Sequence, residues 1–218
     1  MTGYYTEAQR TLQVEHDTVT LADMLDERII LDELDERAIG FISSRDFFFL
    51  STVTGAGEPT VSYKGGGVGV VQVVDPTTLL FPSYDGNGMY LSMGNIAETG
   101  KIGLLFIDFE RPDRVRVQAS ASLSTDADDL ARFPGAQMVV RAEVDQAWIN
   151  CGRYIHKHTR VEDSPYVPDA NGDAPVAAWK RMDVMQPVLS ESAQAEVAEA
   201  GGTIDAEEYA RRRAQGEA

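Results

Sequence analysis

Two glycine-rich segments combine conformational freedom with basic and hydroxyl side chains. The first, SYKGGGVG (62–69), carries Ser62 and Lys64, and the second, YDGNGMYLSMGN (84–95), carries Ser92. Glycines let a ligand approach the backbone closely, and a lysine can hold a phosphate together with hydroxyl and backbone N–H groups. The two segments are therefore candidates for an anion-binding site. Each of them taken alone is also typical of a hairpin turn.

The motifs of several common catalytic centres are missing from the sequence. It has no GxSxG elbow, no P-loop, no GxGxxG between a strand and a helix, and no HExxH. Cys151 is the single cysteine, and with three histidines it cannot form a Cys/His zinc cage. His156 and His158 would share one face of a strand, but the pattern supplies no third ligand. We therefore predict no metal site, assign no catalytic residue, and interpret Cys151 as a small packed residue.

The chain is strongly acidic. Its 218 residues include Lys+Arg 19 and Asp+Glu 35, a formal net charge of −16, and most of the excess lies in residues 1–39 and 190–218. Such a surface repels phosphate backbones, so we expect no binding to nucleic acid. No run approaches the roughly 18 apolar residues that cross a membrane, and the N-terminus lacks the basic start and apolar stretch of a signal peptide. We therefore expect a cytoplasmic protein without a membrane partner.

An amphipathic helical region is predicted before the first strand. Thr20 and Asp23 resemble a capping box at the start of a helix over TLADMLDERI (20–29). Apolar residues then recur at helical spacing over 31–42, with acidic residues on the other face. We expect this second stretch to cover an apolar surface.

From residue 47 to about 150 the sequence is typical of a β meander. In RVRVQASASL (114–123) apolar and polar residues alternate, which predicts one face in the core and one in solvent. Six or seven strands with short connections and few helices predict a mainly β protein with peripheral helices, built as a closed or split barrel. The strand-like runs that make up these strands are 47–53, 60–64, 70–74, 78–81, 102–109, 114–123, 138–144 and 146–151, and a short helix is expected over 124–133.

The order of these pieces resembles that of the pyridoxamine 5′-phosphate oxidase-related FMN-binding proteins. The resemblance covers about residues 34–155 and is closest to a branch with a basic residue before two glycines, a GN after the "FP" strand and a later GNI. It implies a split β-barrel fold, a homodimer, and FMN held in clefts at the dimer interface. The matching segments are FISSRDFFFLSTV (41–53), EPTVSYKGGGVGVVQVVDPTTLLFPSYDGNGMYLSMGNI (58–96), KIGLLFIDF (101–109) and RVRVQASASL (114–123).

The resemblance assigns cofactor contacts to the first glycine-rich segment. Lys64, which follows Ser62 and Tyr63, stands where the branch has its basic residue. Its expected partner is a phosphate or a flavin-ring oxygen, and the alternative is a solvated hairpin lysine. We include all three residues among the predicted cofactor contacts.

The second glycine-rich segment stands where the family passes a loop and a short helix along the ribityl phosphate. A helix that begins near Gly88 would point its N–H groups at the anion. Ser92 is the preferred hydroxyl partner, whereas Met89 and Tyr90 either pack in the core or contact the cofactor. The residues assigned to cofactor binding here are Asn87, Met89, Tyr90, Ser92 and Asn95.

Later residues would come from the second subunit, as in other family members. WINCGRYI (148–155) is similar to a late family strand with an Asn-Cys pair, which assigns Arg153 to a flavin phosphate or a substrate anion. The alternative for Arg153 is a surface ion pair. Trp179 and Lys180 are assigned to the flavin edge, and the alternative for Trp179 is a place in the hydrophobic core.

The sequence also departs from the pyridoxamine-phosphate oxidases proper. It has one lysine where they carry several arginines, and RYIHKHTR (153–160) in place of their C-terminal signature, so vitamin B6 oxidation is not expected. The hypothesis is an FMN-dependent oxidoreductase that acts on an unidentified small organic substrate. The alternatives are a flavin-binding module without turnover and a reductase that uses F420. Another branch binds haem, but nothing here selects an axial histidine.

The predicted organisation has three parts. Residues 1–30 form an acidic N-terminal extension, 31–189 the FMN-binding split-barrel domain, and 190–218 a polar helical tail.

Overall fold

The computed structural model describes residues 4–216, which form two compact units. The first unit runs to Val161 and the second starts at Glu162. This boundary falls inside the range 31–189 that the sequence predicts as one domain. Residues 1–3 and 217–218 of the two predicted extensions lie outside the described residues.

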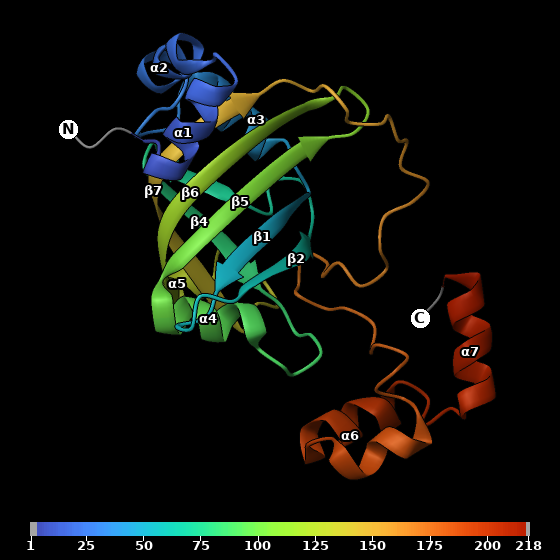
Figure 1. The fold of residues 1–218 in the computed structure, drawn as a ribbon. Coiled ribbons are helices and arrows are strands. Elements are labelled where there is room, and N and C mark those ends of the chain that lie inside the picture. Colours follow the sequence, from blue (N-terminus) through green and yellow to red (C-terminus); the bar gives the residue numbers. More distant parts are fainter. Residues whose placement is uncertain (1–3, 217–218) are drawn as a thin grey trace. The chain divides into compact units, whose positions relative to one another are not determined.

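The first unit is built on one antiparallel sheet of seven strands (Figure 1). The order of the strands is β2-β1-β5-β6-β7-β4-β3, so β2 and β3 are the two edges. The strands are β1 (Phe47–Val53), β2 (Pro59–Gly65), β3 (Gln72–Asp75), β4 (Thr78–Ser83), β5 (Lys101–Asp108), β6 (Asp113–Ser124) and β7 (Met138–Asn150).

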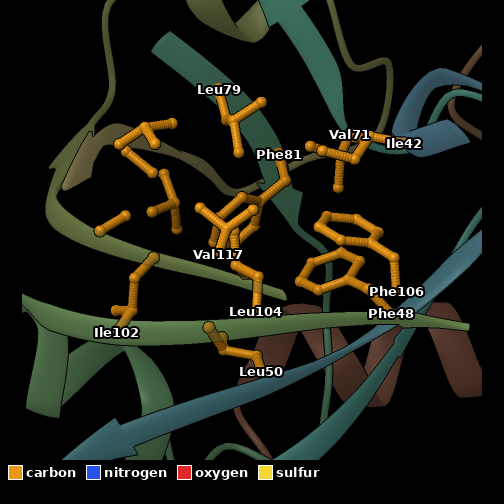
Figure 2. Packing of buried hydrophobic residues seen from close by; sticks show 14 of the residues in the cluster. Ile42, Phe48, Leu50, Val71, Leu79, Phe81, Ile102, Leu104, Phe106 and Val117 are labelled. Carbon is orange, nitrogen blue, oxygen red and sulfur yellow. The ribbon is translucent and has the colours of Figure 1, made fainter. Parts of the chain in front are cut away.

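The sheet curls around a large apolar core. Phe48 of β1 and Phe81 of β4 are in contact, with ring centroids 5.1 Å apart, although their strands are second and sixth in the sheet. Figure 2 shows both rings beside Phe106, with Leu104 and Val117 next to them. Because the two edge strands do not pair with each other, the barrel stays open along one side. The fold is therefore the predicted split barrel, mainly β with peripheral helices.

Two helices close the ends of this barrel. Helix α3 (Glu36–Ser43) begins at Asp35, whose carboxylate accepts a hydrogen bond from the Ala38 N–H at 2.7 Å, and it buries Ile42 completely. Helix α4 (Leu91–Thr99) lies at the opposite end and buries Met93 and Ile96 (Figure 1). The short helix α5 (Ala127–Leu130) falls within the predicted range 124–133.

The N-terminal helices differ from the predicted ones. Helix α1 (Glu7–Glu15) starts with a capping box, whereas α2 (Val19–Arg28) starts after Thr18 without a side-chain cap, so the predicted start at Thr20 is wrong. The predicted helix over 31–42 begins only at Glu36, because Leu31 exchanges two backbone hydrogen bonds with Ala147 of β7. Strand β4 pairs only with residues 138–143 of β7. Leu31 therefore provides hydrogen-bond partners for the backbone N–H and carbonyl groups of Ala147, which lie beyond the end of that pairing.

Strand β7 is continuous where the sequence predicts two strands. The register with β6 shifts between the pairs Gln118–Gln146 and Ala119–Val144, which leaves Asp145 as the extra residue of a β-bulge. The alternation of inward and outward side chains is interrupted at Asp145 and resumes after it. This interruption is why the sequence pattern shows two runs, 138–144 and 146–151, where the structure has one strand.

The second unit contains the 3₁₀ helix η1 (Asp183–Val188) and two polar α-helices, α6 (Glu191–Glu199) and α7 (Ala206–Gln215). Ser190 and Asp205 cap the two helices with their side chains. Across the described residues, no helix has both the length and the apolar character that a membrane span requires.

Candidate functional site

A hollow of about 210 Å³ lies between edge strand β2 and the start of α4. We call it the β2–α4 hollow. Strand β2 contributes Thr60, Ser62 and Lys64, which alternate along one face opposite core residues of β1. The loop 84–90 and the first turn of α4 form the other walls. The hollow brings together six of the eleven predicted cofactor contacts, namely Ser62, Lys64, Asn87, Met89, Tyr90 and Ser92.

The hydroxyl groups of Ser62 and Ser92 form the polar centre of the hollow. Their oxygens lie 3.2 Å apart, within hydrogen-bond distance, and either can donate. Ser92 is buried and Ser62 is half-buried. The hydroxyl that accepts in this bond keeps its own O–H, so the pair can also donate a hydrogen bond to a ligand oxygen.

Lys64 is the one basic side chain in the lining of the hollow. It is half-buried, and burial lowers the pKa of its ammonium group. Within residues 4–216 it forms neither an ion pair nor a side-chain hydrogen bond. An anionic ligand placed beside Lys64 would stabilise the charged form and offset the desolvation.

Helix α4 begins at Leu91, three residues later than the predicted start near Gly88. Gly88 and Tyr90 have positive φ angles of 74° and 49°, which are incompatible with a right-handed helix. Tyr90 occupies the N-cap position and makes no side-chain cap hydrogen bond. The first turn of α4 therefore has N–H groups without a capping side chain, and residues 91–93 of that turn line the hollow.

Two glycines of the first run, Gly65 and Gly66, are required by contacts within the chain. A Cβ atom on Gly65 would lie 2.9 Å from the Tyr63 ring, and one on Gly66 would lie 2.5 Å from a Val70 methyl group. Close approach of a ligand is therefore not the reason for these two glycines. Gly86 and Gly88 differ, because nothing lies within 4 Å of a Cβ atom placed on either of them.

Two predicted contacts lie outside the hollow. Tyr63 is on the opposite face of β2 and stacks on Phe47, with ring centroids 5.4 Å apart. Asn95 is buried, and its amide donates a hydrogen bond of 2.9 Å to the Thr52 hydroxyl. That bond fastens α4 to β1 and so positions the helix that carries Ser92.

Of the late predicted residues, Arg153 in the first unit is also outside the lining of the hollow. Arg153 is exposed after β7, with its guanidinium 6.0 Å from the Tyr154 ring centroid. Cys151 is exposed as well, so its interpretation as a packed residue is wrong. Trp179 and Lys180 belong to the second unit, where the Lys180 ammonium lies 5.8 Å from the Trp179 ring centroid. Their roles stay predictions.

Sequence reasoning missed Thr60 and Tyr84. Thr60 shares the face of β2 with Ser62 and Lys64, a placement that alternation along TVSYK could have supplied. Tyr84 lines the hollow and is half-buried, and burial raises the pKa of its phenol. In the part of the chain that the structure describes, no group of three or more His, Cys, Asp or Glu residues could hold a metal ion.

A family profile described as pyridoxamine 5′-phosphate oxidase matches residues 34–163. Comparison with curated proteins gives no match.

Solved structures with a similar fold include an FMN-binding protein from Syntrophomonas wolfei subsp. wolfei. It is 16% identical, the match covers 65% of this chain and 96% of that chain, and the TM-score is 0.42. HupZ from Group A Streptococcus is 16% identical, the match covers 58% of this chain and 100% of that chain, and the TM-score is 0.45. HutZ, the heme storage protein from Vibrio cholerae, is 19% identical, the match covers 53% of this chain and 94% of that chain, and the TM-score is 0.40.

Proposed function

Because the chain belongs to the pyridoxamine 5′-phosphate oxidase family, we propose that it is an FMN-dependent oxidoreductase whose β2–α4 hollow binds the FMN phosphate. Its substrate would be a small organic molecule. The observation that carries the proposal is Lys64, a half-buried cation with no ionic partner among residues 4–216, placed beside the Ser62–Ser92 hydroxyl pair.

A phosphate suits this set of groups. The dianion would accept hydrogen bonds from the charged Lys64 ammonium and from the uncharged hydroxyl pair, with both Ser62 and Ser92 donating if the phosphate replaces the bond between them. The uncapped N–H groups in the first turn of α4 add partial positive charge on the same side. The flavin supplies the electron transfer when it is bound. The chain's own residues would anchor and orient it, which requires no protein acid or base.

The proposal includes a second copy of the chain. At about 210 Å³ the hollow is smaller than the roughly 300–1,000 Å³ typical of small-molecule sites, so one chain would enclose only part of the cofactor. Its rim exposes apolar side chains, with Val61 69%, Met89 61% and Leu91 54% accessible. Tyr63, 61% accessible, extends this surface onto the outer face of β2. A homodimer that covers this rim would complete the site.

The purified full-length chain tests the cofactor assignment. We expect flavin absorption, and mass spectrometry of the group released on denaturation should identify FMN. A colourless protein that fails to take up added FMN would overturn the proposal. If F420 or haem is released instead, that group is the cofactor, and the assignment of the hollow to the FMN phosphate is wrong.

Turnover separates an enzyme from a binding module. Bound flavin should be reduced by NADH or NADPH and reoxidised by oxygen or an added acceptor. If FMN binds but neither nucleotide reduces it, the alternative of a flavin-binding module without turnover is favoured.

A further inference from the structure

The loop that lines the β2–α4 hollow is fastened at both ends by one residue outside the hollow. The side-chain oxygen of Gln137 accepts a 2.9 Å hydrogen bond from the Tyr90 hydroxyl, and its amide nitrogen donates to Asp85 at 3.4 Å. Asp85 begins the exposed part of the loop and Tyr90 ends it. The Gln137 backbone N–H also donates to the Ser83 carbonyl at 3.0 Å, which places Gln137 beside the end of β4.

Within residues 86–90 the loop has few other restraints. Asn87 accepts a 3.0 Å hydrogen bond from the Met89 N–H, and residues 85–91 are all exposed. Tyr90 adopts a left-handed conformation with a φ of 49°, which is unfavourable for a residue with a side chain. The Tyr90 carbonyl accepts from the Gly94 N–H at 2.7 Å, so its backbone is also the start of α4. A restraint on the Tyr90 side chain therefore acts on the turn that carries Ser92.

We propose that Gln137 is a positioning residue that latches the 84–90 loop and thereby controls how quickly the β2–α4 hollow takes up and releases its ligand. This inference rests on the proposed binding of FMN in the hollow. With the latch formed, the loop and the first turn of α4 hold one arrangement around the phosphate. Without it, Tyr90 loses its side-chain restraint, and the walls of the hollow open more often.

Stopped-flow measurement of FMN binding and release tests the latch. We expect Gln137→Ala to raise the dissociation rate about 3- to 10-fold and to raise the association rate as well. Tyr90→Phe breaks only the bond to Tyr90, whereas Gln137→Ala also removes the bond to Asp85, so the effect of Tyr90→Phe should be equal or smaller. The double variant should be no faster than Gln137→Ala, because that change already removes the bond to Tyr90. Gln72→Ala is the matched control. It removes another side-chain hydrogen bond, to the Arg132 carbonyl at 3.3 Å, from a residue that does not line the hollow.

Limited chymotrypsin digestion of the ligand-free protein provides a readout that does not depend on FMN. Cleavage at Met89–Leu91 should be several times faster in Gln137→Ala and Tyr90→Phe than in wild type and Gln72→Ala. Unchanged cleavage in Gln137→Ala, or unchanged FMN release where FMN binds, overturns the latch. Failure of wild type to bind FMN overturns the proposed function instead, and the digestion then decides on the latch.

Discussion

The hydroxyl oxygens of Ser62 and Ser92 lie 3.2 Å apart and join edge strand β2 to the first turn of α4. The two residues come from the two glycine-rich segments and are thirty positions apart in the sequence. Their contact lies in the lining of the β2–α4 hollow, where Lys64 is also half-buried. Two segments that are each typical of a turn thus form one site.

Replacement of Ser92 by alanine should weaken FMN binding moderately. The change removes a donor that carries no charge of its own, so the loss should lie near the lower end of the range of about 1.5–3 kcal/mol for hydrogen bonds to charged groups, which is a rise of about 10-fold in the dissociation constant. Fluorescence titration with FMN measures this effect. Ser44→Ala, at an exposed serine outside the hollow, is the control and should bind FMN like wild type.

Lys64→Ala should weaken FMN binding more strongly than it weakens riboflavin binding, because riboflavin lacks the phosphate. A hydrogen bond to a charged group contributes about 1.5–3 kcal/mol, which corresponds to a loss on the order of 10- to 100-fold for FMN. Parallel titrations with both ligands measure the difference, and Lys157→Ala is the exposed-lysine control. An equal loss for both ligands would place Lys64 at the flavin ring. An unchanged FMN affinity would move the phosphate elsewhere, with Arg153 the next candidate.

Lys64 should also make the stability of the ligand-free protein depend on pH. Burial disfavours its ammonium form and lowers its pKa in the folded state, so the folded protein carries a penalty while Lys64 is protonated. Lys64→Met should therefore raise the free energy of unfolding near pH 7 by an amount within the range of about 0.5–2 kcal/mol common for stabilising changes. The penalty disappears as the pH rises through the lowered pKa, so the advantage should shrink toward about pH 10. Urea unfolding at several pH values measures it, and an advantage that grows with pH contradicts the argument.

Asn95→Ala should destabilise the first unit. Thr52 is 2% accessible, and loss of the Asn95 amide leaves its hydroxyl without that 2.9 Å bond. An unsatisfied buried group costs about 1–3 kcal/mol. Chemical denaturation measures the change, with Asn87→Ala as an exposed control that should stay within about 0.5 kcal/mol of wild type.

Val61→Asp should separate the proposed dimer. Val61 is 69% accessible in the single chain, so a carboxylate there costs little in the monomer but would be buried in an interface. Light scattering should give roughly twice 23.8 kDa for wild type and about that mass for the variant, with weaker FMN binding. Val74→Asp, at an exposed site on β3, is the control. A wild-type monomer at micromolar concentration would contradict the two-chain site.

Alternation and aromatic content predict the sheet well where a strand has one face in the core and the other more exposed. Strand β1 spans Phe47–Val53 as predicted, and β6 buries Val115 and Val117 on the expected face. The start of α4 was not predictable, since it depends on the positive φ of Tyr90, a residue type that rarely adopts this conformation. Nor could the sequence separate glycines that accommodate Tyr63 and Val70 from glycines that border the hollow, because only the tertiary contacts differ.

The bulge at Asp145 has a consequence for how this chain tolerates insertions and deletions. Val144 lies inward before it and Ala147 lies inward after it, so the parity of the core positions changes within one strand. Loss of the codon for Asp145 would leave Val144 and Gln146 adjacent, in the pairing that β6 already offers them. Loss of a codon a few positions later would instead move the following side chains to the opposite face of the sheet, so that core residues would face solvent. A deletion of one residue in β7 should therefore be tolerated at the bulge and should disrupt the fold when it lies on either side of it.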